Sequence, residues 1–384
     1  MRFRHADGTV VHLAYCTNVH PAEDLEGVFR QLARFAAPVR ELLGTRLLGL
    51  GLWLAHGVAA ELRADPAQAD RLAGELARHG LEVVTLNGFP YGGFQREVVK
   101  KAVYRPDWAE PARLRYTADL AWTLARLLPP DARAGSVSTL PLCWRDRWND
   151  DWWRLAREQL GELRAELARV ERETGRTIRL AFEPEPGCVV ETTEQAVEHL
   201  AGLDPGRYGL SLDTCHLAVA HEDPAAAVAR TRSAGLPVVK LQASVALEAP
   251  VPADPETRRA LAAFAEPRFL HQTRERGGGG TDDLDEAPAR LPGTRPWRTH
   301  FHVPLHADVP APLRSTREVL QGTLEQVFGG PAALTDHVEV ETYTWDVLPS
   351  ELRPRDDAGL VRGIAAELAW MREALLATGL KEIA

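Results

Sequence analysis

Short apolar runs recur along the chain, separated by longer segments whose apolar positions have helical spacing. A run of about four to eight apolar residues is typical of a strand buried on both faces. Eight segments fit this description: residues 11–16, 47–54, 81–86, 136–140, 178–182, 208–212, 238–241 and 338–340. Eight buried strands that alternate with helices predict an α/β fold, a single (β/α)8 TIM barrel domain over residues 1–384.

The helical segments carry recognisable start signals. Asp65 followed by Pro66 predicts a helix over 67–79, because an acidic N-cap and a proline in the first turn both favour initiation. Two pairs match the capping-box pattern, Thr192 with Gln195 and Ser315 with Glu318. Residues 151–173 predict an outer helix whose apolar face consists of Trp152, Leu155, Leu163, Leu167 and Val170.

Two segments interrupt this alternation. Residues 88–108 are too long for a plain strand-to-helix turn, and residues 250–298 contain four consecutive glycines at 277–280. Connections of this length are usually functional lids or disordered segments. We interpret 88–108 as a lid-like insertion over a site. We interpret 250–298 as an insertion made of a helix and a disordered tip.

Composition narrows the class of protein. The net charge of −9 is opposite to the basic face that nucleic acids require. The N-terminus has no apolar signal core, and the most apolar run, 47–55, is far shorter than the roughly 20 residues of a spanning helix. The four cysteines are widely spaced without a CxxC motif, which predicts a reducing compartment. We expect a soluble cytoplasmic protein that handles a small molecule, with no nucleic-acid binding and no membrane insertion.

Three of the predicted strands end in acids, Glu183, Asp213 and Glu341. A carboxylate beside a buried strand is costly unless a cation, a partner or solvent satisfies it. Because the carboxyl ends of barrel strands share one face, we expect these acids to converge on a divalent ion such as Mn²⁺, Mg²⁺, Co²⁺ or Zn²⁺. By alternation, Glu339 faces the same way as Glu341, one layer deeper. The alternative is that each is an ordinary exposed acid at a strand end.

Imidazole and amide groups lie near the same strand ends. His216 follows Asp213 by three residues, which places it near a substrate held by the metal, or else simply at a helix N-terminus. Gln242 ends the seventh predicted strand and is a weak ligand for a hard cation. His300 and His302 alternate along an extended segment and share one face, so we expect a site role for His302. Either Gln242 or His302 would complete the metal site.

Polar residues elsewhere around the barrel mouth are candidates for substrate binding. They are Asn18, His20, Asn87, Lys100, Tyr104, Arg105 and His271. Lys100, Lys101 and Arg105 form a basic cluster on the predicted lid that could hold an anionic group such as phosphate. A solvated helical face is the alternative interpretation of this cluster.

At these residues the chain resembles the xylose isomerase-like TIM barrel superfamily of sugar phosphate isomerases and epimerases. That family presents Glu, Asp, His and Glu from its last four strands to a divalent metal. The resemblance implies that Glu183, Asp213 and Glu341 are metal ligands, and that His216 of the LDTCH stretch contacts substrate. The chain departs from the family at the seventh strand, where Gln242 stands near the usual metal histidine.

Within the superfamily, stretches between about residue 15 and residue 350 are similar to the metabolite traffic protein EboE group. These stretches are YCTNVHP, LNGFPYGGF, VYRPDW, FEPEPG, SLDTCH, VKLQ, HFHVPLH and VETYTW. The resemblance implies an operon that moves a metabolite toward the periplasm, with partner proteins from that operon.

Two classes of function follow. The first is a metal-dependent isomerase or epimerase for a small sugar-like metabolite or its phosphate. In it, Glu183 and Glu341 exchange a proton as base and acid, and His216 holds a substrate oxygen. The same metal site would also suit a metal-dependent hydrolase. The second class is a non-catalytic barrel that binds a metabolite and passes it to a partner, which the amide at Gln242 favours.

Overall fold

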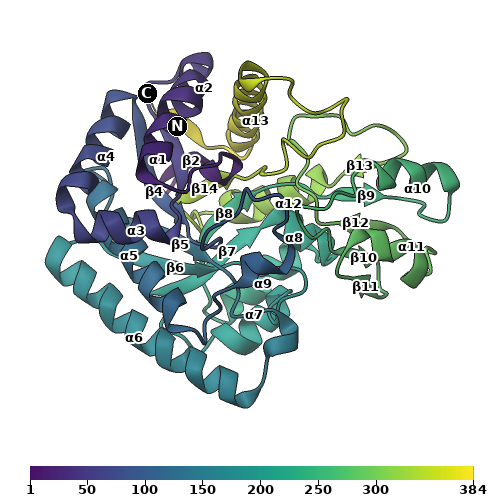
Figure 1. Cartoon of the computed structure of the whole chain (residues 1–384), viewed down its shortest axis with the longest axis horizontal. Coiled ribbons are helices and arrows are strands. Elements are labelled where there is room, and N and C mark those ends of the chain that lie inside the picture. Colours follow the sequence, from purple (N-terminus) through teal and green to yellow (C-terminus); the bar gives the residue numbers. More distant parts are fainter. Residues whose placement is uncertain (384) are drawn as a thin grey trace.

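The computed structural model describes residues 1–383, and eight parallel strands form a closed barrel at its centre (Figure 1). The strands are β2 (Val10–Cys16), β3 (Leu48–Trp53), β4 (Leu81–Asn87), β5 (Ala134–Thr139), β6 (Thr177–Phe182), β7 (Tyr208–Asp213), β8 (Val238–Ala243) and β14 (His337–Val340). Strand β14 closes the barrel, because Val338 pairs with Leu241 of β8 and with Leu13 of β2. Each strand coincides with one predicted apolar run, so the predicted TIM barrel is confirmed.

Helices surround this barrel. They are α1 (Leu25–Gln31), α2 (Ala37–Leu43), α3 (His56–Ala64), α4 (Pro66–Arg78), α5 (Pro111–Leu127), α6 (Asp150–Thr174), α7 (Thr193–Leu200), α8 (Thr214–Val219), α9 (Pro224–Ser233), α12 (Arg317–Phe328) and α13 (Asp357–Ala377). The Asp65 side chain accepts the N–H of Ala67, and both bonds of the Thr192 capping box are present. The predicted capping box at Ser315 is wrong, because Ser315 lies in a strand and α12 follows Thr316 without a side-chain cap.

Helix α6 buries one face as predicted, but Leu155 does not belong to that face. Leu155 is 37% exposed, whereas Ala156 and Leu160 are buried beside Trp152 and Leu163. Positions 152, 156, 160 and 163 are four or three residues apart and therefore share a face. Leu155 lies one position off this stripe and faces solvent.

A buried ion pair fills the barrel interior below the strand ends. Lys240 Nζ lies 2.7 Å from Glu339 Oε1, and neither side chain is exposed. The Glu339 carboxyl occupies the space that a side chain at Gly51 of β3 would need, since a Cβ there would lie 1.1 Å from Oε2. Glycine at position 51 thus makes room for this charge pair.

A small antiparallel sheet stands beside the barrel, at the right of Figure 1. In spatial order it contains β11 (Gly280–Thr281), β10 (Thr273–Glu275), β12 (Trp297–Thr299), β9 (Leu247–Ala249) and β13 (Arg314–Ser315). Helices α10 (Pro255–Ala262) and α11 (Ala287–Arg290) accompany it. The disordered tip predicted for 250–298 is wrong. Residues 277–280 join β10 to β11, and the Glu275 carboxylate accepts the N–H groups of Gly293, Thr294 and Arg295.

The two ends of the chain meet at one side of the barrel. Strand β1 (Arg2–Arg4) pairs antiparallel with β2 and also with β15 (Lys381–Ile383). Figure 1 accordingly shows the N and C marks close together. Within residues 1–383, no helix combines the length and the apolar character needed to cross a membrane.

Candidate active site

Three carboxylates meet at the carboxyl ends of the barrel strands. Glu183 follows β6, Asp213 is the last residue of β7, and Glu341 follows β14. One oxygen of each lies within 4.8 Å of the others, and all three side chains are buried. The structure therefore brings together the acids that strand-end position predicted, in the interior of the barrel mouth rather than in solvent.

Gln242 of β8 contacts all three carboxylates. Its Nε2 lies 2.5 Å from Glu341 Oε2, 3.1 Å from Glu183 Oε1 and 3.5 Å from Asp213 Oδ2. Its Oε1 accepts a hydrogen bond from Ser211 Oγ at 2.7 Å. An amide nitrogen carries two hydrogens, so it cannot satisfy three carboxylates at once. The sequence resemblance implies a metal histidine near this position, where the chain has the amide of Gln242.

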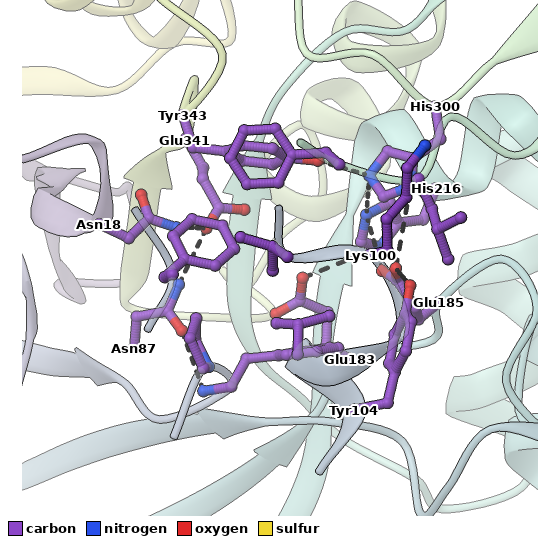
Figure 2. Close-up of a pocket in the computed structure, with 17 residues that line it drawn as sticks. Asn18, Asn87, Lys100, Tyr104, Glu183, Glu185, His216, His300, Glu341 and Tyr343 are labelled. Atoms are coloured by element: carbon purple, nitrogen blue, oxygen red, sulfur yellow. Dashed lines mark hydrogen bonds and ion pairs between the residues drawn. The ribbon is translucent and has the colours of Figure 1, made fainter. Parts of the chain in front are cut away.

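The remaining oxygens of Glu341 and Glu183 differ in their partners. Figure 2 shows Asn18 and Asn87 directing their amide nitrogens at Glu341 Oε1, at 2.8 and 2.9 Å. These two donors fix the orientation of the Glu341 carboxylate. Glu183 Oε2 is buried and has no hydrogen-bond partner among the described residues. Leaving a buried carboxylate oxygen unpaired is costly, so this atom marks a place for a cation, a proton or a ligand.

Asp213 is held by the start of the next helix. Its Oδ1 accepts the N–H groups of Cys215 and His216 at 2.8 and 3.0 Å, as the N-cap of α8. Ser244 Oγ donates to the same oxygen at 2.7 Å. Oδ1 is therefore fully engaged, and Oδ2 is the oxygen that faces Gln242 and the other acids.

Burial and mutual repulsion set the charge of the cluster. Burial raises the pKa of Glu341 to about 8, and the neighbouring charge of Asp213 adds to this effect. Burial, then Glu341 and Asp213, hold the pKa of Glu183 well above its usual range. Burial opposes ionisation of Asp213 as well, but His216 and His302 outweigh it and lower the pKa of that carboxyl. Without another positive charge, the cluster holds protons that a divalent ion would replace.

This donor set fits a divalent cation. Glu183, Asp213 and Glu341 supply three converging carboxylates, one with an unpaired oxygen, and the neighbouring Lys240 is already paired with Glu339. Gln242 can add an amide oxygen, because Ser211 Oγ can either donate to the amide or accept from it. Oxygen-only sets of this kind suit Mg²⁺ or Mn²⁺.

His302 lies on the other side of Asp213. Its Nδ1 lies 2.7 Å from the backbone oxygen of Glu341, and its Nε2 lies 3.3 Å from His300 Nε2. Among residues 1–383, potential ligand groups join it to Asp213 and His216 but not to Glu183 and Glu341 together. The geometry thus favours Gln242 over His302 as the fourth ligand of the carboxylate cluster.

The three buried histidines differ in charge. Burial lowers the pKa of His302 to about 4 and that of His300 well below its usual value. Burial also disfavours the cationic form of His216, but Asp213 and Glu185 outweigh it and raise that pKa. His302 and His300 are therefore neutral at physiological pH, and His216 is the imidazole that most readily carries a proton.

A cavity of about 50 Å³ lies above these groups. Its polar lining consists of Asn18, Asn87, Lys100, Tyr104, Glu183, Glu185, His216, His300 and Glu341. An apolar cluster of Trp53, Phe94, Val99, Phe269 and Tyr343 packs at the same mouth. Phe94 and Val99 belong to the segment 88–108, so this segment covers the cavity as a lid would. A volume of about 50 Å³ has room for only a few water molecules, so a sugar would need the covering segment to move.

Several residues predicted to bind substrate do not line this cavity. The His20 ring stacks on Phe35 with centroids 4.2 Å apart, and Arg105 pairs with Glu110. His271 is buried between Glu266 and the backbone oxygen of His300. The basic cluster on the lid is likewise engaged, because Lys100 pairs with Asp283 and Lys101 with Asp146 and Asp282. Binding roles for these residues stay predictions.

Two cavity residues lie outside the main predicted site set, Glu185, which is a weaker candidate from the sequence, and Tyr343, which the sequence did not indicate. Glu185 accepts a hydrogen bond from Tyr104 Oη at 2.7 Å, lies 3.1 Å from His216 Nε2, and has its pKa raised to about 7 by burial. Tyr343 Oη lies 3.3 Å from His300 Nε2. Each lies two residues beyond a site acid, Glu185 after Glu183 and Tyr343 after Glu341. For Tyr343, alternation was the signal that could have found it.

The chain belongs to the xylose isomerase-like TIM barrel family, whose model matches residues 50–249. A xylose isomerase-like TIM barrel protein from Mycobacterium smegmatis, solved in complex with magnesium, is 14% identical with a TM-score of 0.51, over 95% of this chain and 98% of that chain. D-psicose 3-epimerase with D-tagatose, from Clostridium cellulolyticum H10, is 14% identical with a TM-score of 0.49, over 95% and 99%.

The IolI protein with a bound zinc atom is 14% identical with a TM-score of 0.48, over 95% of this chain and 98% of that chain. At such identities these likenesses concern the fold alone. None of the curated proteins compared with the chain matches it. The predicted superfamily is confirmed, and the finer resemblance to the EboE group stays a prediction.

Proposed function

We propose that the protein is a metal-dependent isomerase or epimerase of a small polyhydroxylated metabolite, sugar-like or a sugar phosphate. The observation that carries the proposal is the convergence of Glu183, Asp213 and Glu341 beneath a closed cavity lined by amides and imidazoles. Family membership supports it, as does the likeness of the fold to proteins described as sugar epimerases. Fold by itself does not define the reaction, since TIM barrels host many.

The ion would be held by Glu183, Asp213 and Glu341, with Gln242 as the fourth ligand. When bound there, a divalent ion polarises adjacent oxygens of an open-chain sugar and stabilises developing negative charge. Asn18 and Asn87 keep the Glu341 carboxylate in place through its Oε1, which leaves Oε2 toward the centre of the site. The α8 N-terminus does the same for Asp213 through Oδ1.

Glu183 and Glu341 are placed to move the proton. Glu183 Oε2 has no partner among the described residues and is the oxygen free to take a proton from a substrate carbon. Glu341, which Asn18 and Asn87 orient through Oε1, can return a proton through Oε2 from the other side. The C–H bond that breaks at one face is re-formed at the other face or at the adjacent carbon, so no redox partner is required. His216 lines the cavity between these acids and Glu185, where it can hold a substrate oxygen.

Apolar side chains limit the access of water to the site. Phe94, Val99, Phe269 and Tyr343 close the mouth, and a dry site strengthens every electrostatic interaction inside it. We extend the proposal to a cytoplasmic location, which the four free, buried cysteines support. A link to metabolite export and to partner proteins rests on the sequence resemblance to the EboE group.

The test is exchange of substrate hydrogen with solvent. The Mn²⁺-loaded protein is incubated in D₂O with ketopentoses, ketohexoses and their phosphates, and deuterium incorporation is followed by proton NMR. We expect incorporation into at least one sugar, and a loss of about 100-fold or more in Glu183→Gln and Glu341→Gln. Glu367→Gln, a buried carboxyl on α13 outside the cavity lining, is the matched control and should keep the parent rate.

The competing function is a barrel that binds a metabolite without transforming it, which the amide at Gln242 in place of a metal histidine favours. It predicts saturable binding of a sugar with no deuterium incorporation. That result, in protein shown to carry stoichiometric Mn²⁺, would overturn the isomerase proposal.

A further inference from the structure

Three imidazoles lie beside the carboxylate cluster. His216 lies in α8, whereas His300 and His302 follow β12 of the small sheet. His216 Nε2 lies 3.1 Å from His300 Nε2, which lies 3.3 Å from His302 Nε2. All three rings are buried, and Figure 2 shows His216 and His300 facing each other across the cavity from Glu341.

The other ring nitrogen of each histidine is committed to an oxygen acceptor. His216 Nδ1 lies 2.8 Å from the Pro184 backbone oxygen, and His302 Nδ1 lies 2.7 Å from that of Glu341. A carbonyl oxygen can only accept, so both Nδ1 atoms carry the hydrogen. In the neutral form of each ring, Nε2 therefore carries a lone pair that is directed toward the other two histidines.

His300 follows the same rule through an amide. Its Nδ1 lies 2.8 Å from Gln272 Oε1. Gln272 Nε2 donates to the backbone oxygen of Pro186 at 2.8 Å and contacts Tyr104 Oη at 2.9 Å. Exchanging the oxygen and nitrogen of this amide would therefore lose the hydrogen bond to Pro186. All three rings thus point Nε2 inward, and an oxygen acceptor fixes each from behind. Metal-binding histidines are held by this kind of contact.

Two of the separations between the Nε2 atoms match a coordination polyhedron. Zinc-to-nitrogen bonds of about 2.0–2.1 Å place tetrahedral ligands about 3.3 Å apart. The two measured separations, 3.1 and 3.3 Å, fall at this value. One proton can bridge either His216 Nε2 and His300 Nε2 or His300 Nε2 and His302 Nε2, but not both pairs. In the other pair, the two lone pairs then face each other.

Carboxylates flank the triad on both sides. Glu185 groups with His216 and His300, and Asp213 groups with His216 and His302, all with ligand atoms within 4.8 Å. Glu185 Oε2 is 3.1 Å from His216 Nε2 and lines the cavity. A fourth ligand is therefore present, and the site opens to the cavity where a substrate oxygen could bind.

We infer that His216, His300 and His302 form a second cation site, an imidazole site for a d-block dication such as Zn²⁺, next to the oxygen site of Glu183, Gln242 and Glu341. Asp213 belongs to both groups. Imidazole ligands select zinc and its neighbours, whereas the carboxylate and amide set suits Mg²⁺ or Mn²⁺. The chain thus places two chemically different sites at one cavity, and the histidine absent from β8 is compensated by histidines from the small sheet.

Zinc X-ray absorption of the full-length protein tests the site without a mutation. The inference predicts one tightly held Zn²⁺ with three imidazole ligands at about 2.0–2.1 Å. No bound zinc at saturating concentration, or a zinc shell of oxygens alone, would overturn it. The first result would leave a proton-bridged histidine cluster as the explanation of the geometry.

Variants then separate the two sites. His300→Ala and His302→Ala should weaken Zn²⁺ binding by at least about 10-fold in chelator competition and leave Mn²⁺ binding intact, which also reports a folded protein. His306→Ala, a histidine of the same segment outside the triad, is the control. Glu341→Gln should show the reverse, with Mn²⁺ weakened and Zn²⁺ kept. Zinc bound equally well by the His300 and His302 variants would contradict the imidazole site, whatever the deuterium-exchange assay shows.

Discussion

Glu367 of α13 is buried like the site carboxylates but lies outside the cavity lining. Its Oε1 accepts a hydrogen bond from Thr342 Oγ1 at 2.7 Å and from the N–H of Leu305 at 2.9 Å. It thereby joins the segment after β14 to the segment after His302. Burial nevertheless raises the pKa of this carboxyl from 4.5 to about 7, because desolvation outweighs the two hydrogen bonds.

This shift predicts a pH dependence of stability. The folded state keeps the Glu367 proton between pH 4.5 and about 7, whereas the unfolded state has lost it. Stability is therefore greatest below pH 4.5 on account of this group and falls as the pH rises to 7, by roughly 3 kcal/mol. Glu367→Gln should lack this pH-dependent loss. In urea unfolding, the free energy of unfolding of the variant should therefore rise relative to that of the parent from pH 5 to 8. Parallel pH profiles for the two proteins would contradict the assignment.

At single residues, sequence reasoning succeeded where position along a strand fixes direction. Glu183, Asp213 and Glu341 follow buried strands, and such acids can only meet at the barrel mouth. The contacts of Gln242 with all three carboxylates could not be predicted, because they depend on the rotamers of side chains from four strands. The pairing of Lys100 with Asp283, which engages the predicted anion site, also joins residues far apart in sequence.

The longer barrel strands could be predicted from the sequence, whereas the short strands of the small sheet could not. The eight barrel strands have long apolar runs, whereas the strands of the small sheet have two or three residues each and too little pattern to detect. The small sheet nevertheless helps to build the site. Its strand β12 leads directly to His300, which lines the cavity, and to His302. In the segment before β10, Arg268 O accepts the N–H groups of Val99 and Lys100 at 2.8 and 2.9 Å.

These contacts tie the lid 88–108 to the insertion 250–298. We predict that Asp283→Asn loosens the lid, because it removes the charge that pairs with Lys100 but keeps an acceptor for the backbone N–H of His271. Hydrogen exchange over residues 95–104 should accelerate by about 2- to 5-fold, the effect of a partly exposed ion pair of up to about 1 kcal/mol. Asp308→Asn, at a fully exposed carboxylate that pairs with Arg317, should leave the lid unchanged. Equal exchange in both variants would show that the ion pair does not hold the lid.

For the molecule as a whole, the main feature is an excess of buried negative charge at the carboxyl ends of the barrel strands. Glu183, Glu185, Asp213 and Glu341 are buried around one cavity, and the nearby Lys240 is already paired with Glu339. The apolar pattern predicted the barrel that brings these acids together. It did not predict how much positive charge they need, because that depends on how deeply the acids are buried together in the folded barrel.

The central claim is that Glu183, Asp213 and Glu341 bind one divalent cation. Anomalous diffraction at the manganese edge, from crystals of the full chain grown with Mn²⁺, tests it most directly. The account predicts a single strong peak within about 2.0–2.6 Å of a carboxylate oxygen from each of the three residues. A map without a peak among these carboxylates at saturating Mn²⁺ would contradict it.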